Sequence, residues 1–205
     1  DVCRRWMQYA NTPMLWQSVE QRNGLGCCQT DTVVELGEWK LGKLHGAGVY
    51  QSRPMIIYCG GFIEGRRSGL GRAHWSNGIE HDGEWLDDMR CGKAQMRRPD
   101  GYLFDGQWKA QGRHGHATER CPNGDIYEGQ FVSNKRNGNG VYKFWNAETK
   151  QHVLEYRGEF DLDVPQGRGI LTSASGEVVY SGEWHKGMPV TPVERTLPTV
   201  WREFT

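Results

Sequence analysis

Hydrophobic and polar residues alternate along most of the chain, with glycine at regular places in the alternation. In the stretch YEGQFVSNKRNGNGVY, which begins at Tyr127, a ring, a glycine and a second ring occupy every second position up to Phe131. After a polar turn, Gly138 and Gly140 continue the same spacing. Period-two alternation is typical of β-strands, because successive side chains point to opposite faces of a sheet. The stretch therefore predicts two strands joined by a turn.

The same pattern recurs along the chain as a repeat. The repeats begin at Glu35, Tyr58, His81, Phe104, Tyr127, Tyr156 and Tyr180. The first four intervals are 23 residues each, followed by intervals of 29 and 24. The openings read ELGEW, YCGGF, HDGEW, FDGQW, YEGQF, YRGEF and YSGEW, with glycine always third and Trp or Phe always fifth. A regular period of this length indicates stacked copies of one structural unit.

Glycine also marks the second half of each repeat. Counting the first residue of a repeat as position 1, position 12 is glycine in six repeats; position 14 is glycine, or alanine at Ala94 and Ala117. Glycine weakens a strand interior, so its regular presence requires an explanation. We expect an aromatic ring from a neighbouring strand to lie over the bare backbone, an arrangement called aromatic rescue. The methyl groups of Ala94 and Ala117 would leave such a ring less room.

Two kinds of turn separate the strands. Asn-Gly or Asp-Gly pairs at 77–78, 100–101 and 123–124 are typical of tight hairpin turns, because glycine accepts the positive φ that these turns require. The other connection, at about positions 8 to 12, is predicted to be longer. Each repeat is thus expected to be a β-hairpin, and successive hairpins to continue as one antiparallel meander.

These residues resemble MORN repeats, the membrane occupation and recognition nexus unit. The resemblance rests on the Tyr-x-Gly-Glu/Gln-Trp/Phe opening, the glycine turn, Gly-x-Gly and the closing Asn-Gly. It covers about residues 35–190, as six full repeats and a truncated one from Tyr180, followed by a C-terminal tail at 191–205. Residues 1–34 would form an N-terminal extension, in which the segment 23–26 looks like the remnant of an earlier repeat whose first strand has decayed.

The resemblance implies an all-β fold, namely an elongated, single-layer, twisted antiparallel sheet of stacked β-hairpins with a concave aromatic groove. A short helical or irregular segment is expected at the N-terminus and an extended tail at the C-terminus. Proteins with such repeats are mostly scaffolds and adaptors of cilia, flagella, cytoskeletal collars and membrane contact sites. Some of these repeats are attached to lipid kinases or other enzymes.

The aromatic groove is the best candidate for a binding surface. Its members are Tyr58, Phe62, Trp85, Phe104, Trp108, Tyr127, Phe131, Tyr156, Phe160, Tyr180 and Trp184. A single-layer sheet would leave this face partly open, and a large exposed apolar strip usually marks a binding site. Because Tyr and Trp often dominate protein interfaces, we expect a protein partner there; an amphipathic helix would suit the groove. The alternative is that the rings only pack on one another over the glycines.

Basic residues in the turns form a second candidate. Arg66, Arg67, Lys135 and Arg136 would lie along one edge of the stacked hairpins, where they could bind anionic phospholipid. The competing explanation is that edge charges keep a flat sheet from pairing with another, although open sheet ends also allow self-association. The chain has 25 basic and 25 acidic residues. This balance disfavours a membrane surface and gives no reason to expect nucleic acid as a partner.

The sequence gives no support for catalysis, so we predict neither an enzyme nor a cofactor. The carboxylates Glu38, Glu84, Glu128 and Glu159 recur along the repeats and are expected on a solvated face. The Gly-Asn-Gly segment at 138–140 is not a phosphate loop, because that motif needs a helix after the strand. Histidines and cysteines lack the spacing of a metal site. The six cysteines are expected to be reduced thiols.

Together these features predict a non-catalytic structural scaffold or adaptor that holds protein partners in a multi-subunit assembly, through the aromatic groove and the hairpin edges. The alternatives are a peripheral membrane adaptor and a regulatory segment of a larger enzyme, the latter because the chain begins at Asp1 instead of methionine. We expect a cytoplasmic location in the cytoskeleton, a cilium or a flagellum. An organelle reached after removal of a transit peptide is the alternative location.

Overall fold

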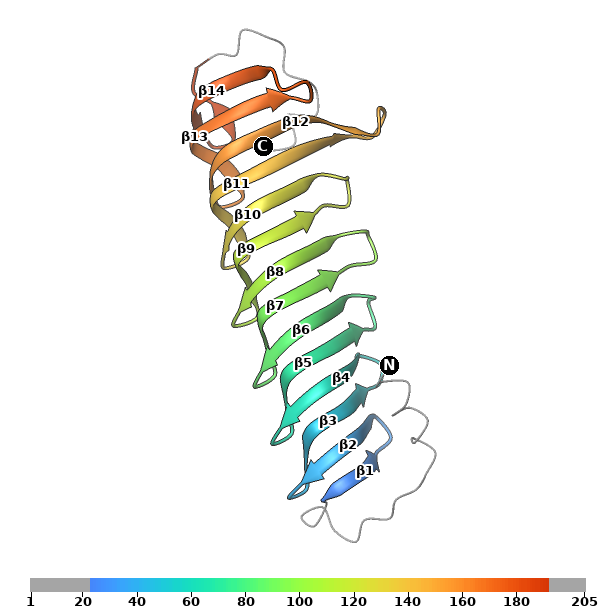
Figure 1. The fold of residues 1–205 in the computed structure, drawn as a ribbon. Helices are drawn as coiled ribbons and strands as arrows, with labels where there is room; N and C mark the ends of the chain where they lie inside the picture. Colours follow the sequence, from blue (N-terminus) through green and yellow to red (C-terminus); the bar gives the residue numbers. More distant parts are fainter. Residues whose placement is uncertain (1–22, 192–205) are drawn as a thin grey trace. The chain divides into compact units, whose positions relative to one another are not determined.

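The computed structural model describes residues 23–191, and in this range the regular elements are all β-strands (Figure 1). The chain divides into two compact halves, residues 1–99 and 100–205, which we call the N-terminal half and the C-terminal half. Among the described residues, no helix could span a membrane. The helical segment and most of the tail predicted at the two ends fall on residues 1–22 and 192–205, outside the described range.

The N-terminal half is a single antiparallel layer in which each strand pairs with its neighbour in sequence. Its strands are β1 (Gly24–Gln29), β2 (Val33–Lys40), β3 (Lys43–Ser52), β4 (Ile56–Ile63), β5 (Arg66–Trp75), β6 (Glu80–Leu86) and β7 (Met89–Arg97). Hairpins joined in chain order, without crossovers, are what the period-two pattern predicts.

The C-terminal half is built in the same way. Its strands are β8 (Leu103–Lys109), β9 (Gly112–Arg120), β10 (Ile126–Val132), β11 (Lys135–Asn146), β12 (Gln151–Asp161), β13 (Val164–Ser173), β14 (Val178–His185) and β15 (Met188–Pro189). The predicted all-β class with stacked antiparallel hairpins is therefore confirmed.

The register of the strands is the same in successive repeats. Within a hairpin, position 3 stands opposite position 14, as in the pair Gly129 and Gly140. Between hairpins, position 14 stands opposite position 3 of the next repeat, as Gly140 stands opposite Gly158. Gly26 stands opposite Gly37 in this second way. Strand β1 therefore occupies the place of the second strand of a repeat that precedes Glu35.

The Asn-Gly and Asp-Gly pairs lie in turns between strands, and Gly78, Gly101 and Gly124 have the predicted positive φ, of 80°, 93° and 95°. The predicted order of the turn lengths is wrong, because the two are reversed. The tight turn is formed by positions 7 and 8, as at Ser133 and Asn134, whose φ angles are 48° and 72°. Both positions have positive φ in all seven repeats, which is the signature of a two-residue type I′ turn. The Asn77-Gly78 pair lies instead in the longer connection between β5 and β6, where the Gly78 amide donates to the Trp75 carbonyl at 2.8 Å.

The signal was misleading because Asn and Asp tolerate positive φ nearly as well as glycine when their side chains bond to nearby backbone. Asn134 does so: its Oδ1 accepts the amide proton of Arg113 in the preceding hairpin at 2.8 Å. Asp88 and Asp163 accept from Arg67 and Arg136 in the same manner. Position 8 therefore connects one turn to the turn before it.

The glycines at position 12 are bulge residues within the second strand. Gly138 has a φ of 89°, and the register of β10 against β11 shifts beside it. The side chain of Gln130, at position 4, accepts the amide proton of Asn139 across this bulge at 3.0 Å. Glu84 and Glu159 make the equivalent bonds at 2.9 and 3.2 Å. The position-4 carboxylates Glu38, Glu84 and Glu159 are exposed, as the sequence predicts, and the oxygen of a glutamate or glutamine at this position can in addition bond across the bulge.

Candidate binding surfaces

The predicted groove residues form a ladder of rings packed edge to face. In the C-terminal half the ladder runs from Phe104 to Trp184, with successive centroids 4.9–5.4 Å apart and ring planes at 79–88°. In the N-terminal half, the Tyr58 ring contacts Phe62 and Trp85 at 5.2 and 5.3 Å in the same geometry. Such pairs stabilise a fold beyond the area that they bury.

Tyrosine at position 1 lies over the glycines, as aromatic rescue predicts. The Tyr127 ring covers Gly129 on its own strand and Gly140 on the neighbouring strand, so that a Cβ at either glycine would overlap it. Its hydroxyl donates to the Gln130 carbonyl at 2.9 Å. Tyr58, Tyr156 and Tyr180 make the same bond to the carbonyl three residues later. The sequence predicts a ring over a glycine of the neighbouring strand. The structure adds a second contact, because the same tyrosine ring also covers the glycine two residues later on its own strand.

The two alanines at position 14 belong to the two repeats of the 81–120 region that lack this tyrosine. Ala94 follows His81, and Ala117 follows Phe104. A Cβ added at Gly83 or Gly106 would overlap the alanine methyl on the opposite strand instead of a phenol. The methyl therefore fills space that the tyrosine ring occupies in other repeats.

Three tryptophans at position 5 hydrogen-bond to the strand that precedes their own hairpin. The indole Nε1 of Trp85 donates to the Gly71 carbonyl at 3.0 Å, and Trp184 donates to Gly169 at 3.1 Å. Trp39 bonds in the same way to Gly26 on β1, at 3.1 Å. The eleven predicted groove residues have exposed fractions between 0 and 9%. The rings thus hold the sheet together and offer a partner little area, while their role in binding stays a prediction.

Two of the predicted anion-binding residues lie inward. Arg67 stacks on the Trp85 ring, with its guanidinium carbon 4.5 Å from the ring centroid, and its Nε donates to Asp88 at 2.8 Å. Arg136 lies over Tyr127 and Tyr142 at 5.2 and 4.9 Å. Stacking of a partly desolvated cation on a ring stabilises the fold.

The other two predicted cations are exposed and also have carboxylate neighbours. Arg66 lies 3.8 Å from Asp87, and Lys135 lies 2.6 Å from Asp163. Each of the four predicted anion-binding residues therefore has a carboxylate partner within the chain, although Arg136 shares Glu119 with Arg113. An anionic lipid would have to compete with these pairs.

A buried carboxylate in the C-terminal half escaped the sequence analysis. Glu119 is 4% exposed and receives hydrogen bonds from Tyr102, Arg113 and Arg136 at 2.5, 2.6 and 2.8 Å. Burial opposes the charge of Arg136, but Glu119, together with other nearby groups, raises the pKa of the guanidinium overall. Glu119 occupies position 16, where the neighbouring repeats have Met96 and Tyr142. A charge at an otherwise apolar position was the available signal.

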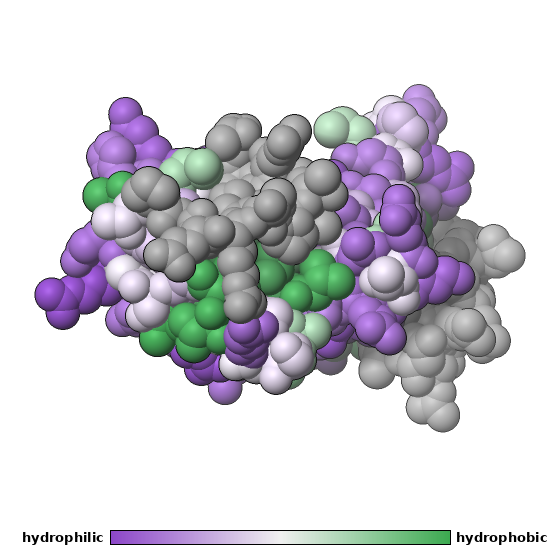
Figure 2. Space-filling model, turned by 90° about the horizontal axis from the view of Figure 1, so that it is seen from above, coloured by the Kyte–Doolittle hydropathy of each residue, from purple (hydrophilic) through white to green (hydrophobic). Residues whose placement is uncertain are grey.

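The type I′ turns carry exposed apolar side chains. We call Leu41, Ile63, Leu86 and Met89 the turn-edge row of the N-terminal half; their exposed fractions are 72, 53, 56 and 41%. They stand at positions 6, 7 and 9 of three successive repeats. Figure 2 shows hydrophobic residues gathered in limited areas of the visible face, among mainly hydrophilic ones. The row is apolar surface that remains available to a partner.

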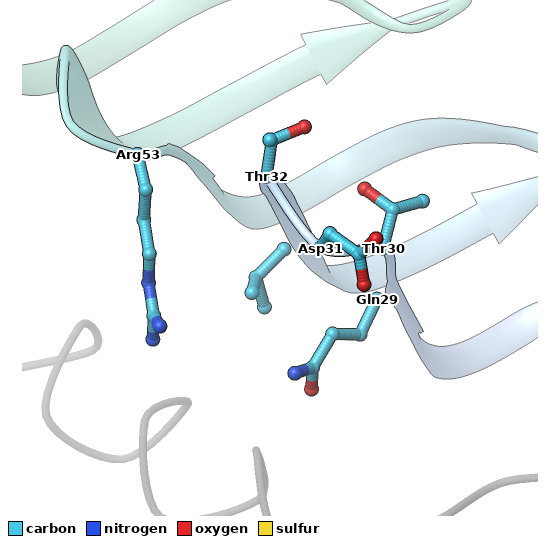
Figure 3. Close-up of a pocket in the computed structure, with 6 residues that line it drawn as sticks. Gln29, Thr30, Asp31, Thr32 and Arg53 are labelled. Carbon is cyan, nitrogen blue, oxygen red and sulfur yellow. The ribbon is translucent and has the colours of Figure 1, made fainter.

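A polar depression lies beside the turn between β1 and β2. Its lining is Gln29, Thr30, Asp31, Thr32, Val34 and Arg53, and Figure 3 shows the long side chains of Gln29 and Arg53 at its two sides. Thr30 is used locally, because its Oγ1 accepts the Val33 amide proton at 3.0 Å.

The cysteines partly contradict the sequence-based expectation. Cys27, Cys28, Cys91 and Cys121 are free thiols, but Cys59 is disulfide-bonded. Burial raises the pKa of the Cys27 thiol, and Cys28 beside it adds to the effect. Among residues 23–191, no group of three or more His, Cys, Asp or Glu side chains is placed to hold a metal ion.

The repeats have the register, the ring-over-glycine packing and the glycine pattern that the sequence resemblance implies. The family model for the MORN repeat matches residues 36–53, 58–80, 81–101, 104–126, 127–144, 156–178 and 180–190, more than half of the chain. The chain belongs to the MORN-repeat family. MORN repeats are non-enzymatic modules that bind proteins or membrane lipids. No curated protein matches the chain significantly.

Proposed function

We propose that this MORN-repeat chain is a non-catalytic scaffold that holds a protein partner through the turn edges of its hairpins. The supporting observation is that the turn-edge row is exposed, whereas the other candidate binding residues already have partners within the chain. The aromatic rings are buried against one another, and the inward arginines form ion pairs. Large apolar side chains left exposed along one edge are candidates for a protein contact. A place in a cytoskeletal or ciliary assembly is part of this proposal and is supported by the resemblance of its repeats to such proteins.

A peripheral membrane adaptor is the second candidate. The exposed cations Arg66 and Lys135 favour it, but each lies within 4 Å of a carboxylate, and the formal net charge of the chain is zero. Surface attraction to anionic lipid grows with unpaired basic residues near the surface. We therefore rank the protein partner first, and a regulatory segment of a larger enzyme third.

The test compares partner capture by three forms of the chain. The double variant Ile63→Asp and Leu86→Asp places charges in the turn-edge row, and Met55→Asp is the matched control, since Met55 is 65% exposed at the opposite turns of the same half. We expect native lysate to yield a partner with wild type and Met55→Asp, but not with the double variant. Equal recovery with all three forms, or no stable partner with wild type, would refute the proposed surface.

Vesicle sedimentation separates the lipid alternative. Binding to phosphatidylserine vesicles that disappears in moderate salt, and in Arg66→Gln with Lys135→Gln, would favour the membrane adaptor. We expect no binding above that to neutral phosphatidylcholine vesicles.

A further inference from the structure

The described array begins and ends with half a repeat. At the start, β1 supplies the second strand of a repeat, with Gly24 at position 12 and Gly26 at position 14. At the end, β14 supplies a first strand, with Tyr180, Gly182 and Trp184 at positions 1, 3 and 5. Among the described residues, β1 pairs only with β2, and the outer side of β14 pairs only with the two-residue strand β15.

The sequence after β15 cannot complete the last repeat in the usual way. Position 12 is Thr191, where six repeats have glycine. Position 13 is Pro192, which has no amide proton to donate to the position-4 carboxylate of Glu183. Position 14 is Val193, where the other repeats with tyrosine at position 1 have glycine. A valine side chain would overlap the tyrosine ring, as a Cβ at Gly140 or Gly169 would.

The sequence before β1 is equally unsuited to complete the first repeat. Positions 1, 3 and 5 would be Pro13, Leu15 and Gln17, where the other repeats have mostly a ring, always glycine, and always a second ring. Leucine at position 3 would stand against the opposite position-14 glycine, where even a single Cβ added at Gly60 or Gly129 would overlap backbone. Among the described residues, each end of the array therefore shows half a repeat, and the sequence beside it lacks the glycine and ring pattern that would complete it.

We propose that these two half repeats complete each other between two copies of the chain, so that β14 of one copy pairs with β1 of the next. The register follows from the intact repeats: Gly182 would stand opposite Gly26, as Gly158 stands opposite Gly169. Ser181 would then stand opposite Cys27, and Tyr180 opposite Cys28. Strand β15 occupies positions 9 and 10. Val190 and Thr191 follow at positions 11 and 12, where the Val190 amide donates to the Glu183 carbonyl at 2.9 Å and the Thr191 hydroxyl bonds to that of Tyr180 at 3.2 Å. Asn23 and Gly24 of the incoming copy have the same two positions, so the joint requires Val190 and Thr191 to give up these bonds to β14.

The joint reproduces the contacts of an intact repeat. Tyr180 already bonds to the Glu183 carbonyl at 2.9 Å and lies over Gly182; in the joint it also covers Gly26, as Tyr156 covers Gly169. The Gly26 carbonyl is already held by Trp39, just as Gly169 is held by Trp184. Strand addition at an open sheet edge supplies main-chain hydrogen bonds, and the glycines make it selective for this register.

This contact is head to tail, so it does not close on itself as a two-fold dimer does. Purified chain should therefore show an average mass that rises with concentration, without a fixed dimer endpoint. The inference concerns the ends of the array and stands whether or not the turn-edge row binds a partner.

A designed disulfide tests the register. Directly opposed residues of antiparallel strands have Cβ atoms close enough for a disulfide, and Cys27 is a free thiol. We expect Ser181→Cys to give disulfide-linked dimers, trimers and longer species under mild oxidation. The ladder should be lost when Cys27→Ser is added. Glu128→Cys is the matched control, because position 128 is also exposed at position 2 of its repeat but lies on β10, which is paired on both sides.

Mixing two forms fixes the direction of the contact. The Ser181→Cys, Cys27→Ser double variant should form a mixed disulfide with wild type that stops at the dimer. Three outcomes would each overturn the proposal. The first is a wild-type homodimer linked through Cys27, and the second is a disulfide formed within one chain. The third is a series of linked species from Ser181→Cys that is no stronger than the series from Glu128→Cys. Circular dichroism of each variant checks that the sheet is intact.

Discussion

The ring of Tyr127 fills the space in which a side chain at Gly140 would stand on the neighbouring strand. The choice of residue at these two positions is coupled along the chain. In the complete hairpins that begin with tyrosine, at Tyr58, Tyr127 and Tyr156, position 14 is glycine. In the repeats that begin with histidine or phenylalanine, position 14 is alanine. One packing problem thus has two solutions in the same molecule.

Replacing the tyrosine and glycine pair of one repeat by the phenylalanine and alanine pair of another should show this coupling. Gly140→Ala should destabilise the chain by about 1–3 kcal/mol, because the added methyl overpacks the site. Tyr127→Phe should cost about 1 kcal/mol, since its hydroxyl bonds to the Gln130 carbonyl. The double variant recreates the Phe104 and Ala117 pair, so its loss should be smaller than the sum of the single losses by about 1 kcal/mol. Urea unfolding followed by tryptophan fluorescence measures all three, and strict additivity would contradict the coupling.

A pair of identical substitutions should have effects of opposite sign. Ala110 is the first residue of a type I′ turn, with a φ of 45°, a conformation that costs an L-residue about 1–2 kcal/mol. Ala110→Gly should therefore raise the free energy of unfolding by roughly 0.5 kcal/mol after the entropy cost of glycine. Ala117→Gly should lower it by about 1–2 kcal/mol, because a buried methyl is lost in a strand of ordinary φ. Thermal midpoints of the two variants that shift in the same direction would argue against this account.

The fold could be predicted from the sequence because every repeat carries the same constraint. A ring at position 1 or 5 and a glycine at position 3 are short-range signals, and seven copies of them leave little freedom. The turns were assigned in reverse because the Asn-Gly signal at 77–78 is local, whereas Asn134 owes its positive φ to a bond with Arg113 in the preceding hairpin.

The charged interior was missed for the same reason. The sequence places Arg136 in a basic turn but cannot show that its guanidinium turns onto Tyr142 and Glu119. Such contacts join residues that are 6 or 17 positions apart in sequence and become visible only when neighbouring strands are set in register.

Neutralising Glu119 should be costly. Glu119→Gln keeps the size of the side chain but leaves the partly buried guanidinium groups of Arg113 and Arg136 without their countercharge. Removing one partner of a buried ion pair typically costs about 3–5 kcal/mol, so the urea midpoint should fall markedly. The matched control is Glu128→Gln on the exposed face of β10, which should change the stability by less than about 0.5 kcal/mol. Similar losses in both variants would show that Glu119 is not held as a charge.

Acid should destabilise the N-terminal half through His81. This side chain is fully buried against Trp85, and burial, with the positive charge of Arg90 adding to it, lowers its pKa to about 4. In the unfolded chain a histidine has a pKa of about 6.5. Between these two values the unfolded state binds the extra proton and the folded state does not. The stability that His81 contributes is therefore complete above about pH 6.5 and is lost as the pH falls toward 4.

The variant His81→Phe isolates this effect, because phenylalanine occupies position 1 in the repeat from Phe104 and does not titrate. The free energy of unfolding of wild type minus that of His81→Phe should be constant above about pH 7. It should then fall by up to about 1.4 kcal/mol per pH unit on acidification, the value for one proton. Urea titrations at half-unit steps from pH 7.5 to 4.5 measure the difference. Parallel pH profiles for the two forms would mean that His81 binds its proton equally well in the folded and the unfolded chain, which its burial against Trp85 and its proximity to Arg90 oppose.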